Sequence, residues 1–279
     1  MAFDDHFSLE PTDSPTRWIC EYSPLVLTPR RTLQGGAGLA AALLATERVA
    51  GRPTIWATAQ YLSFAAETAP IDLEVTIEVV GHNTTQARCV LSRNGQEVLT
   101  AHAALGSRPH GENATWVTPP EVPAADLCEP YRFFRSGRND FGDLMELRLA
   151  LGRQSDELGG EGGGNRSAWW CRVERGRHVP GIGELSFIGD LFPLSFMELY
   201  GRRYAGTSID NTVRFGQRAE TDWVLVDCRV DQVATGFGYG RAYLWSDDRQ
   251  LLATATQTAV VKFVADDAPY FGPTNRRTV

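Results

Sequence analysis

Thr207-Ser208-Ile209-Asp210-Asn211-Thr212-Val213-Arg214-Phe215 and the earlier stretch Ile55-Trp56-Ala57-Thr58-Ala59-Gln60-Tyr61-Leu62-Ser63-Phe64 occupy corresponding places in two similar halves of the chain. Each stretch follows a helical segment and precedes segments rich in Val, Ile, Thr and aromatic residues, a composition typical of β-strands. Each half also contains a turn signal, Asn94-Gly95 in the first and Asp247-Asp248-Arg249 in the second. The repeated order predicts one structural unit that is present twice.

The expected elements follow the same order in both halves. The first copy runs from about Leu33 to Gly106, and the second begins near Ser186. An α+β fold follows, in which each helix is wrapped by a curved antiparallel sheet. The alternative, a helix placed before a meander without any duplication, stays open. We predict helices over Ala37–Val49 and Phe187–Tyr200, and strands over Thr16–Tyr22, Leu25–Thr28, Thr54–Ala65, Ile71–Val80, Thr84–Arg93, Gln96–Gly106, Leu144–Leu151, Ala168–Glu174, Thr207–Phe215, Trp223–Val233, Gly236–Ser246 and Gln250–Phe263.

A proline-rich stretch between the halves indicates the domain boundaries. Residues Pro109–Pro130 favour an extended connection, because proline cannot donate a backbone hydrogen bond. We therefore predict an N-terminal unit over residues 1–108, a linker over 109–143 and a C-terminal unit over 144–279.

Composition narrows the class of protein. Hydrophobic residues make up 43% of the 279, which is enough for a substantial core. The net charge of -7 disfavours nucleic acid or an anionic membrane as the main partner. Five widely spaced cysteines predict buried, reduced thiols, and no apolar run is long enough to span a membrane. These features predict a soluble cytoplasmic protein.

One acidic residue interrupts an apolar segment. Asp190 lies within Phe187-Ile188-Gly189-Asp190-Leu191-Phe192, where a carboxylate should be excluded unless it is paired or functional. Helix capping next to Pro193 is an equal alternative. Ser208 and Gln257 lie on predicted strands that follow Asp190 in the chain.

The first half is expected to lack this polar site. Aligning Phe64 with Phe215 and Arg88 with Arg241 places Ala57 opposite Ser208 and Ala104 opposite Gln257. On similar spacing, Asp190 falls opposite Gly38 or Leu39. Only the second half would then carry the polar site.

Several common enzyme classes lack their usual motifs. The sequence contains no G-x-S-x-G elbow, no H-E-x-x-H and no Walker motif, and its five histidines form no recognisable set of metal ligands. These enzyme classes therefore lose their usual support from the sequence.

The repeat, Gly35-Gly36 before the first helix, Asp190, the Thr-Ser-Ile-Asp strand and Gln257 together resemble the acyl-CoA thioesterase II family. The resemblance covers roughly residues 15–263 and implies a double-hotdog fold, built from two tandem repeats. It implies that Asp190, Ser208 and Gln257 are the catalytic residues, and that a backbone N–H at Gly35 or Gly36 binds the substrate oxyanion. The implied substrate is an acyl-CoA thioester, without a cofactor, in lipid metabolism. Association into a homo-oligomer stays open. Asn211 stands where many relatives have histidine.

The implied mechanism is hydrolysis by a water held in line with the thioester carbonyl. Asp190 would orient this water and accept its proton, while Ser208 and Gln257 fix its direction. Two alternatives remain at this point. The first is an acyl-CoA-binding protein on the same fold without turnover, and the second is a hotdog enoyl-CoA hydratase, for which an Asp/His pair would be expected.

Overall fold

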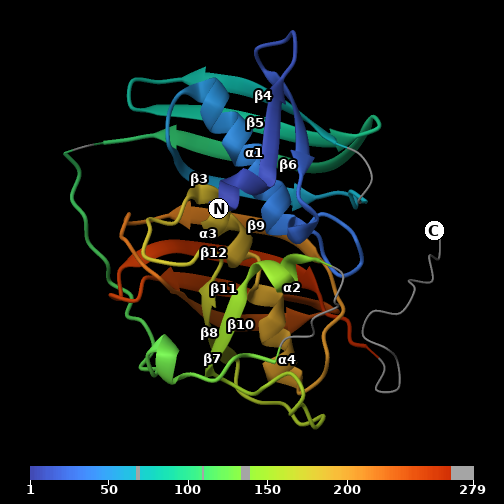
Figure 1. Ribbon diagram of the computed structural model, residues 1–279, viewed down its shortest axis with the longest axis vertical. Helices are drawn as coiled ribbons and strands as arrows, with labels where there is room; N and C mark the ends of the chain where they lie inside the picture. The colour runs from blue at the N-terminus through green and yellow to red at the C-terminus, as the bar shows by residue number, and fades with distance from the viewer. Residues whose placement is uncertain (67–69, 109, 133–138, 265–279) are drawn as a thin grey trace.

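Twelve antiparallel strands form one continuous sheet in the computed structural model of the chain (Figure 1). The structure describes residues 1–66, 70–108, 110–132 and 139–264. From one edge to the other the order is β1-β2-β4-β5-β6-β3-β9-β12-β11-β10-β8-β7. The strands are β1 (Phe7–Pro11), β2 (Arg17–Tyr22), β3 (Thr54–Tyr61), β4 (Ile71–Val80), β5 (Thr84–Arg93), β6 (Gln96–Gly106), β7 (Glu146–Leu151), β8 (Arg166–Arg172), β9 (Ser208–Phe215), β10 (Val224–Ala234), β11 (Phe237–Trp245) and β12 (Leu251–Val260).

Strands from the two halves of the chain meet in the middle of this sheet. Read inward from either edge, the first six strands in the chain and the last six follow the same order. The central pair is β3 with β9, which are antiparallel and place Thr58 opposite Thr212. The Thr212 hydroxyl donates to the Thr58 hydroxyl at 2.7 Å. The ladder of hydrogen bonds is therefore continuous from one half to the other.

Two helices pack against one another inside the curve of the sheet (Figure 1). Helix α1 (Gly35–Ala50) is buried around most of its circumference, as expected for an Ala- and Leu-rich helix enclosed by a sheet. Helix α3 (Ile182–Gly189) meets the beginning of α1. A Cβ atom at Gly36 would collide with the Ser186 carbonyl oxygen and lie 2.9 Å from the Phe187 Cα. The absence of a side chain at Gly36 thus allows the two helices to approach closely.

The predicted helix over Phe187–Tyr200 is wrong in its bounds. Helix α3 begins five residues earlier, at Ile182 after Gly181, and ends at Gly189. A 3₁₀ turn follows over Phe192–Leu194, and a short helix α4 spans Ser195–Tyr200. Pro193 explains this break, because it has no backbone N–H to continue the hydrogen bonds of α3.

The predicted strand over Leu25–Thr28 is also wrong. Residues Pro24–Val26 form a 3₁₀ turn, which begins at Ser23, whose hydroxyl accepts a hydrogen bond from the Leu25 N–H. On its outer side β2 pairs instead with β1, which had not been predicted, and on its inner side it pairs with β4. The other predicted strands are present, with ends that differ by a few residues.

The predicted linker over residues 109–143 packs against both halves where the structure describes it. Ala125 and Cys128 pack with Trp170 and Trp223 in a small apolar cluster beside the second part of the sheet. Helix α2 (Phe141–Leu144) begins within the predicted linker, and the Phe141 N–H donates to the Leu27 carbonyl at 2.9 Å. Linker residues 109 and 133–138, and residues 265–279 of the predicted C-terminal unit, lie outside the described residues.

Two further predictions concern cysteines and membranes. All five cysteines are buried and free, which confirms the expectation of reduced thiols.

In the described part of the chain, no helix has the length and apolar character needed to cross a membrane.

Candidate active site

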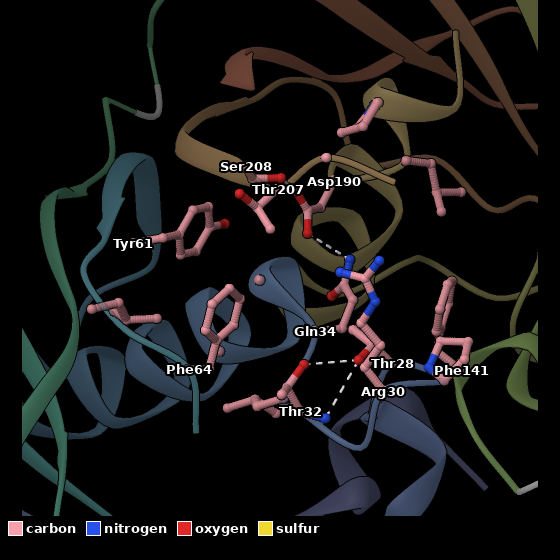
Figure 2. A pocket seen from close by; sticks show the side chains of 18 of the residues that line it. Thr28, Arg30, Thr32, Gln34, Tyr61, Phe64, Phe141, Asp190, Thr207 and Ser208 are labelled. Atoms are coloured by element: carbon pink, nitrogen blue, oxygen red, sulfur yellow. Dashed lines mark hydrogen bonds between the residues drawn. The ribbon is translucent and has the colours of Figure 1, made fainter. Parts of the chain in front are cut away.

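The Asp190 carboxylate lies between the two helices and accepts four hydrogen bonds. Asp190 follows the last residue of α3, and its side chain points toward the start of α1 (Figure 2). Its Oδ1 atom accepts from the Ser208 hydroxyl at 3.2 Å and from the Gln257 amide. Its Oδ2 atom accepts from Gln34 Nε2 at 2.7 Å and from the Gly36 N–H at 2.9 Å. A buried acid is held in place from both halves of the chain.

The structure brings the three predicted catalytic residues together. Asp190 ends a helix, Ser208 is the first residue of β9, and Gln257 lies on the neighbouring strand β12. Besides its bond to Asp190, Gln257 Nε2 donates to the Ser208 hydroxyl oxygen at 2.8 Å. The three side chains thus form a closed triangle of hydrogen bonds.

Gln34 was not predicted as a site residue. It caps α1, because its Oε1 atom accepts from the Ala37 N–H at 2.7 Å while its Nε2 atom donates to Asp190. The only signal in the sequence is a polar residue immediately before the helix that begins with Gly-Gly. Gln34 thereby ties the start of α1 to the acid.

The capping alternative for Asp190 takes an unexpected form. The carboxylate accepts from the first turn of α1, not from its own helix, and a helix N-terminus favours a negative charge. The Gly36 N–H, one of the two groups expected to bind the substrate oxyanion, donates to Asp190 in this structure. The Gly35 N–H has no partner among the residues that the structure describes.

Burial raises the pKa of Asp190 to about 6. The hydrogen bonds from Gly36, Gln257 and Ser208 act in the opposite direction because they stabilise the anion. Asp190 is therefore mostly ionised at neutral pH, yet basic enough to accept a proton from water.

A cavity of about 260 Å³ opens beside Asp190 and Ser208 (Figure 2). Most of its wall is apolar and comes from both halves of the chain. Arg30 and Asp190 are the two charged residues among its described lining residues, and Gln257 stands behind the wall. The apolar part of the wall includes Leu33, Tyr61, Phe64, Val98, Leu99, Phe141, Leu191, Leu194 and Tyr204.

The predicted blank positions of the first half are out of register. In the pairing of β3 with β6, Ile55 has no partner residue on the opposite strand. In the pairing of β9 with β12, Ile209 has none. Matching these irregularities places Thr54, not Ala57, at the position of Ser208. It also places Ala103, not Ala104, at the position of Gln257.

The helix positions do not correspond either. Gly38 and Leu39 lie near the beginning of α1, whereas Asp190 follows the end of α3. The first half thus has a hydroxyl at one matched position but no amide at the other, because Ala103 has no polar side chain.

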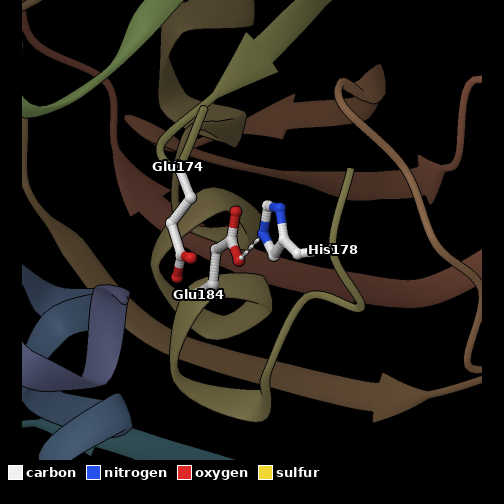
Figure 3. A group of neighbouring side chains, drawn as sticks. All are labelled: Glu174, His178 and Glu184. Carbon is white, nitrogen blue, oxygen red and sulfur yellow. Dashed lines mark hydrogen bonds and ion pairs between the residues drawn. The ribbon is translucent and has the colours of Figure 1, made fainter. Parts of the chain in front are cut away.

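A second polar cluster lies at the start of α3 (Figure 3). Candidate ligand atoms of Glu174, His178 and Glu184 all lie within 4.8 Å of one another, a grouping that the sequence had not indicated. However, His178 Nε2 is 2.8 Å from a carboxylate oxygen of the buried Glu184, and its Nδ1 is 3.0 Å from the Gly176 carbonyl. Glu174 accepts from the Phe3 N–H at 2.5 Å. The first of these contacts joins His178 to α3, and the bond from Phe3 joins the N-terminus to the segment that follows β8.

His178 should make the stability of the fold depend on pH. Its hydrogen bond to Glu184 raises the pKa of His178 to about 9 from 6.5. The stabilisation is therefore fully present below pH 6.5 and is lost as the pH rises through about 9. We expect His178→Gln to lower the free energy of unfolding by about 1–3 kcal/mol at pH 6.

Urea unfolding of the wild type and the variant at pH 6 and at pH 10 would measure this difference. It should shrink at the higher pH. His102→Gln, on an exposed position of β6, is the matched control. A difference of equal size at both pH values would contradict the assignment.

The sequence of the chain matches one known protein family. Residues 108–261 match the family model described as the acyl-CoA thioesterase C-terminal domain. No curated protein sequence matches the chain.

Similar solved structures come from several bacteria. A protein from Novosphingobium aromaticivorans, assigned as a thioesterase, is 25% identical over 91% of this chain and 98% of its own, with a TM-score of 0.76. A hotdog-fold protein of unknown function from Alicyclobacillus acidocaldarius is 21% identical over 94% and 98%, with a TM-score of 0.80. The acyl-CoA thioesterase II TesB2 from Mycobacterium marinum is 17% identical over 95% and 99%, with a TM-score of 0.73. The chain therefore has the hotdog fold.

Proposed function

Because the chain belongs to the acyl-CoA thioesterase family, we propose that it hydrolyses acyl-CoA thioesters to a free acid and CoA at the Asp190 site. One observation carries this proposal: the carboxylate of a buried residue, Asp190, lies in the wall of a mostly apolar cavity. Such a cavity suits an acyl chain, and the carboxylate can act as a general base at its wall.

In the proposed reaction, a water enters from the cavity between Asp190 and Ser208. Asp190 accepts a proton from this water as its oxygen adds to the thioester carbonyl carbon. When the carbonyl re-forms, the carbon–sulfur bond breaks, and Asp190 passes the proton to the leaving sulfur, so that CoA leaves as a thiol and the carboxylate is regenerated. Ser208 and Gln257 aim the water by hydrogen bonds, and their mutual bond restricts both side chains.

We further propose that the fold is a double hotdog, with units over residues 1–108 and 144–279 joined by the linker. The matching strand order of the two halves supports this, as does the central pairing of β3 with β9. The matched irregularities at Ile55 and Ile209 support it as well. In this arrangement the C-terminal unit carries Asp190, while the N-terminal unit supplies Gln34 and part of the cavity wall.

The hydratase alternative finds no support at the site. Among the described residues, none that lines the cavity or bonds to Asp190 is a histidine, so the expected Asp/His pair is missing. The remaining rival is a protein that binds acyl-CoA without turning it over.

Release of free CoA thiol from acyl-CoA substrates of increasing chain length would test the proposed function. A cavity of about 260 Å³ is at the small end of ligand sites, so we expect short acyl groups to react faster than long ones. Saturable binding without release of thiol at any chain length would favour the binding-only protein.

Gln257→Ala should lower kcat more than Ser208→Ala. Gln257 donates to both other members of the triangle, and no solvent can replace it easily because it lies behind the cavity wall. Ser208 lines the cavity, where a second water could take the place of its hydroxyl. We expect a loss of about 10²-fold for Gln257→Ala, at the lower end of the contribution of acid–base groups, and about a tenth of that for Ser208→Ala. Steady-state kinetics with matched thermal melts would check this order, and the reverse order would contradict it.

A further inference from the structure

Three polar side chains beside the site have buried atoms without a hydrogen-bond partner. Asn211 is 0% exposed, and neither its Oδ1 nor its Nδ2 atom has a partner in the described structure. The hydroxyl of Tyr61 and the Oε1 atom of Gln257 are in the same situation. A buried polar atom without a hydrogen bond destabilises the folded state, because it has lost its bonds to water. Their grouping beside the acid points to a ligand that supplies the missing bonds.

The register of the sheet brings these residues to one place. Asn211 lies opposite Gln257 on one side and opposite Ala59 on the other. Tyr61 follows Ala59 by two residues, so it points to the same face of the sheet. Tyr61 therefore comes from the first half of the chain, while Asn211 and Gln257 come from the second. Of these three, Tyr61 alone lines the cavity.

Tyr61 and Asp190 both pack closely against Gly35. A Cβ atom on Gly35 would lie 2.9 Å from Asp190 Oδ2 and 3.1 Å from the Tyr61 hydroxyl oxygen. Both oxygens therefore lie next to the start of α1, at a position with no room for a side chain. Figure 2 shows the Tyr61 ring with its hydroxyl directed toward Asp190 and Ser208.

Tyr61 remains a hydrogen-bond donor over the whole pH range of an assay. Burial, together with the charge of Asp190, holds the pKa of Tyr61 well above 10, while the nearby Asn211 amide acts in the opposite direction. The Asn211 amide thus lies close to the Tyr61 hydroxyl, although no hydrogen bond joins the two groups here.

We propose that the Tyr61 hydroxyl donates a hydrogen bond to the carbonyl oxygen of the bound thioester, and that Asn211 holds this hydroxyl in position. The proposal rests on the proposed function and adds a catalytic residue from the first half of the chain. As water adds to the carbonyl carbon, the carbonyl electron pair moves onto oxygen, where Tyr61 stabilises the charge. The pair returns when the carbon–sulfur bond breaks. Gly36 is not available for this role, because its N–H already donates to Asp190.

Tyr61→Phe removes the hydroxyl and keeps the ring that packs in the wall. Loss of one oxyanion donor typically lowers kcat by about 10²–10³-fold, and we expect an effect of this size with little change in KM. Tyr239→Phe is the matched control, because its hydroxyl bonds to Gln232 on an exposed hairpin away from the cavity. Asn211→Ala should lower kcat less. In the double variant the losses should not multiply, because Asn211 acts through Tyr61.

The affinities of two stable CoA analogues distinguish a hydrogen bond from Tyr61 to the carbonyl from a role of Tyr61 in packing alone. In one analogue a methylene replaces the thioester sulfur, so the carbonyl is kept. In the other, a thioether, the carbonyl is absent. Tyr61→Phe should weaken binding of the ketone analogue by about 10-fold, as for one lost hydrogen bond, and leave the thioether unaffected.

The outcomes separate this inference from the proposed function. A wild-type protein that releases no CoA from any acyl-CoA would refute the proposed function. Wild-type turnover with an equally active Tyr61→Phe variant would overturn the role of Tyr61 alone. Equal weakening of both analogues would also overturn it, because Tyr61 would then only shape the cavity.

Discussion

Asp190→Asn should lower kcat for acyl-CoA hydrolysis by about 10²–10⁴-fold, the contribution expected of a general base. Asparagine has nearly the shape of aspartate but cannot accept the proton of the attacking water. Each carboxylate oxygen now accepts two hydrogen bonds, so the amide nitrogen of the variant must face a pair of donors. We therefore expect some loss of stability as well, but retention of the fold.

Steady-state kinetics on the purified variant, with circular dichroism to check its fold, would measure this effect. The dependence of wild-type kcat/KM on pH is an independent check. Because the pKa of Asp190 is about 6, activity should fall as the pH drops through this value. Wild-type activity in a folded variant would leave Asp190 only with the role of capping α1.

Gly36→Ala should lower both the stability of the fold and the rate of turnover. The added Cβ would collide with the backbone carbonyl of Ser186, which cannot rotate away as a side chain can. It would also lie 2.8 Å from the Asp190 Cβ. Helix α1 must then move away from α3, at a cost of about 1–3 kcal/mol for an overpacked contact. The same shift draws the Gly36 N–H away from Asp190, so we expect kcat to fall by at least about 10-fold, as for a misplaced catalytic group.

The midpoint of urea unfolding and kcat should be measured on the same preparation of this variant. Gly159→Ala is the matched control, because a Cβ at that position meets no atom within 4 Å and its backbone is not left-handed. If the two variants unfold at the same midpoint, the close approach of the helices is not required for stability.

Local patterns were sufficient to predict most strands and the antiparallel architecture. The alternation within each strand and the turn at Asn94-Gly95 are properties of neighbouring residues. The bounds of α3 were missed because the apolar run around Phe187 continues on both sides, so composition alone does not show where the helix begins or ends. The blank positions were misplaced because the sequence alignment matched Phe64 with Phe215. The strand pairing instead matches Ile55 with Ile209, the residues that have no partner in their ladders.

The site was predictable only in part. The structure brings together Asp190, Ser208 and Gln257, which the family resemblance had indicated. Gln34 and Tyr61 could not be predicted. They reach the acid through the packing of α1 on α3 and the pairing of β3 with β9, contacts between residues about 150 positions apart that no local pattern encodes.

The pairing of β3 with β9 also bears on how the chain could have evolved. Two separate, identical subunits joined at such strands would carry every substitution twice, once on each side of their symmetry axis. Here both strands belong to one polypeptide, so a change at Ala103 is not repeated at Gln257. The first half can therefore have alanine where the second half has Gln257, while Gln34 and Tyr61 of the first half line the cavity beside Asp190. In a single chain, single mutations can thus give the two halves different functions, which is not possible in a symmetric dimer.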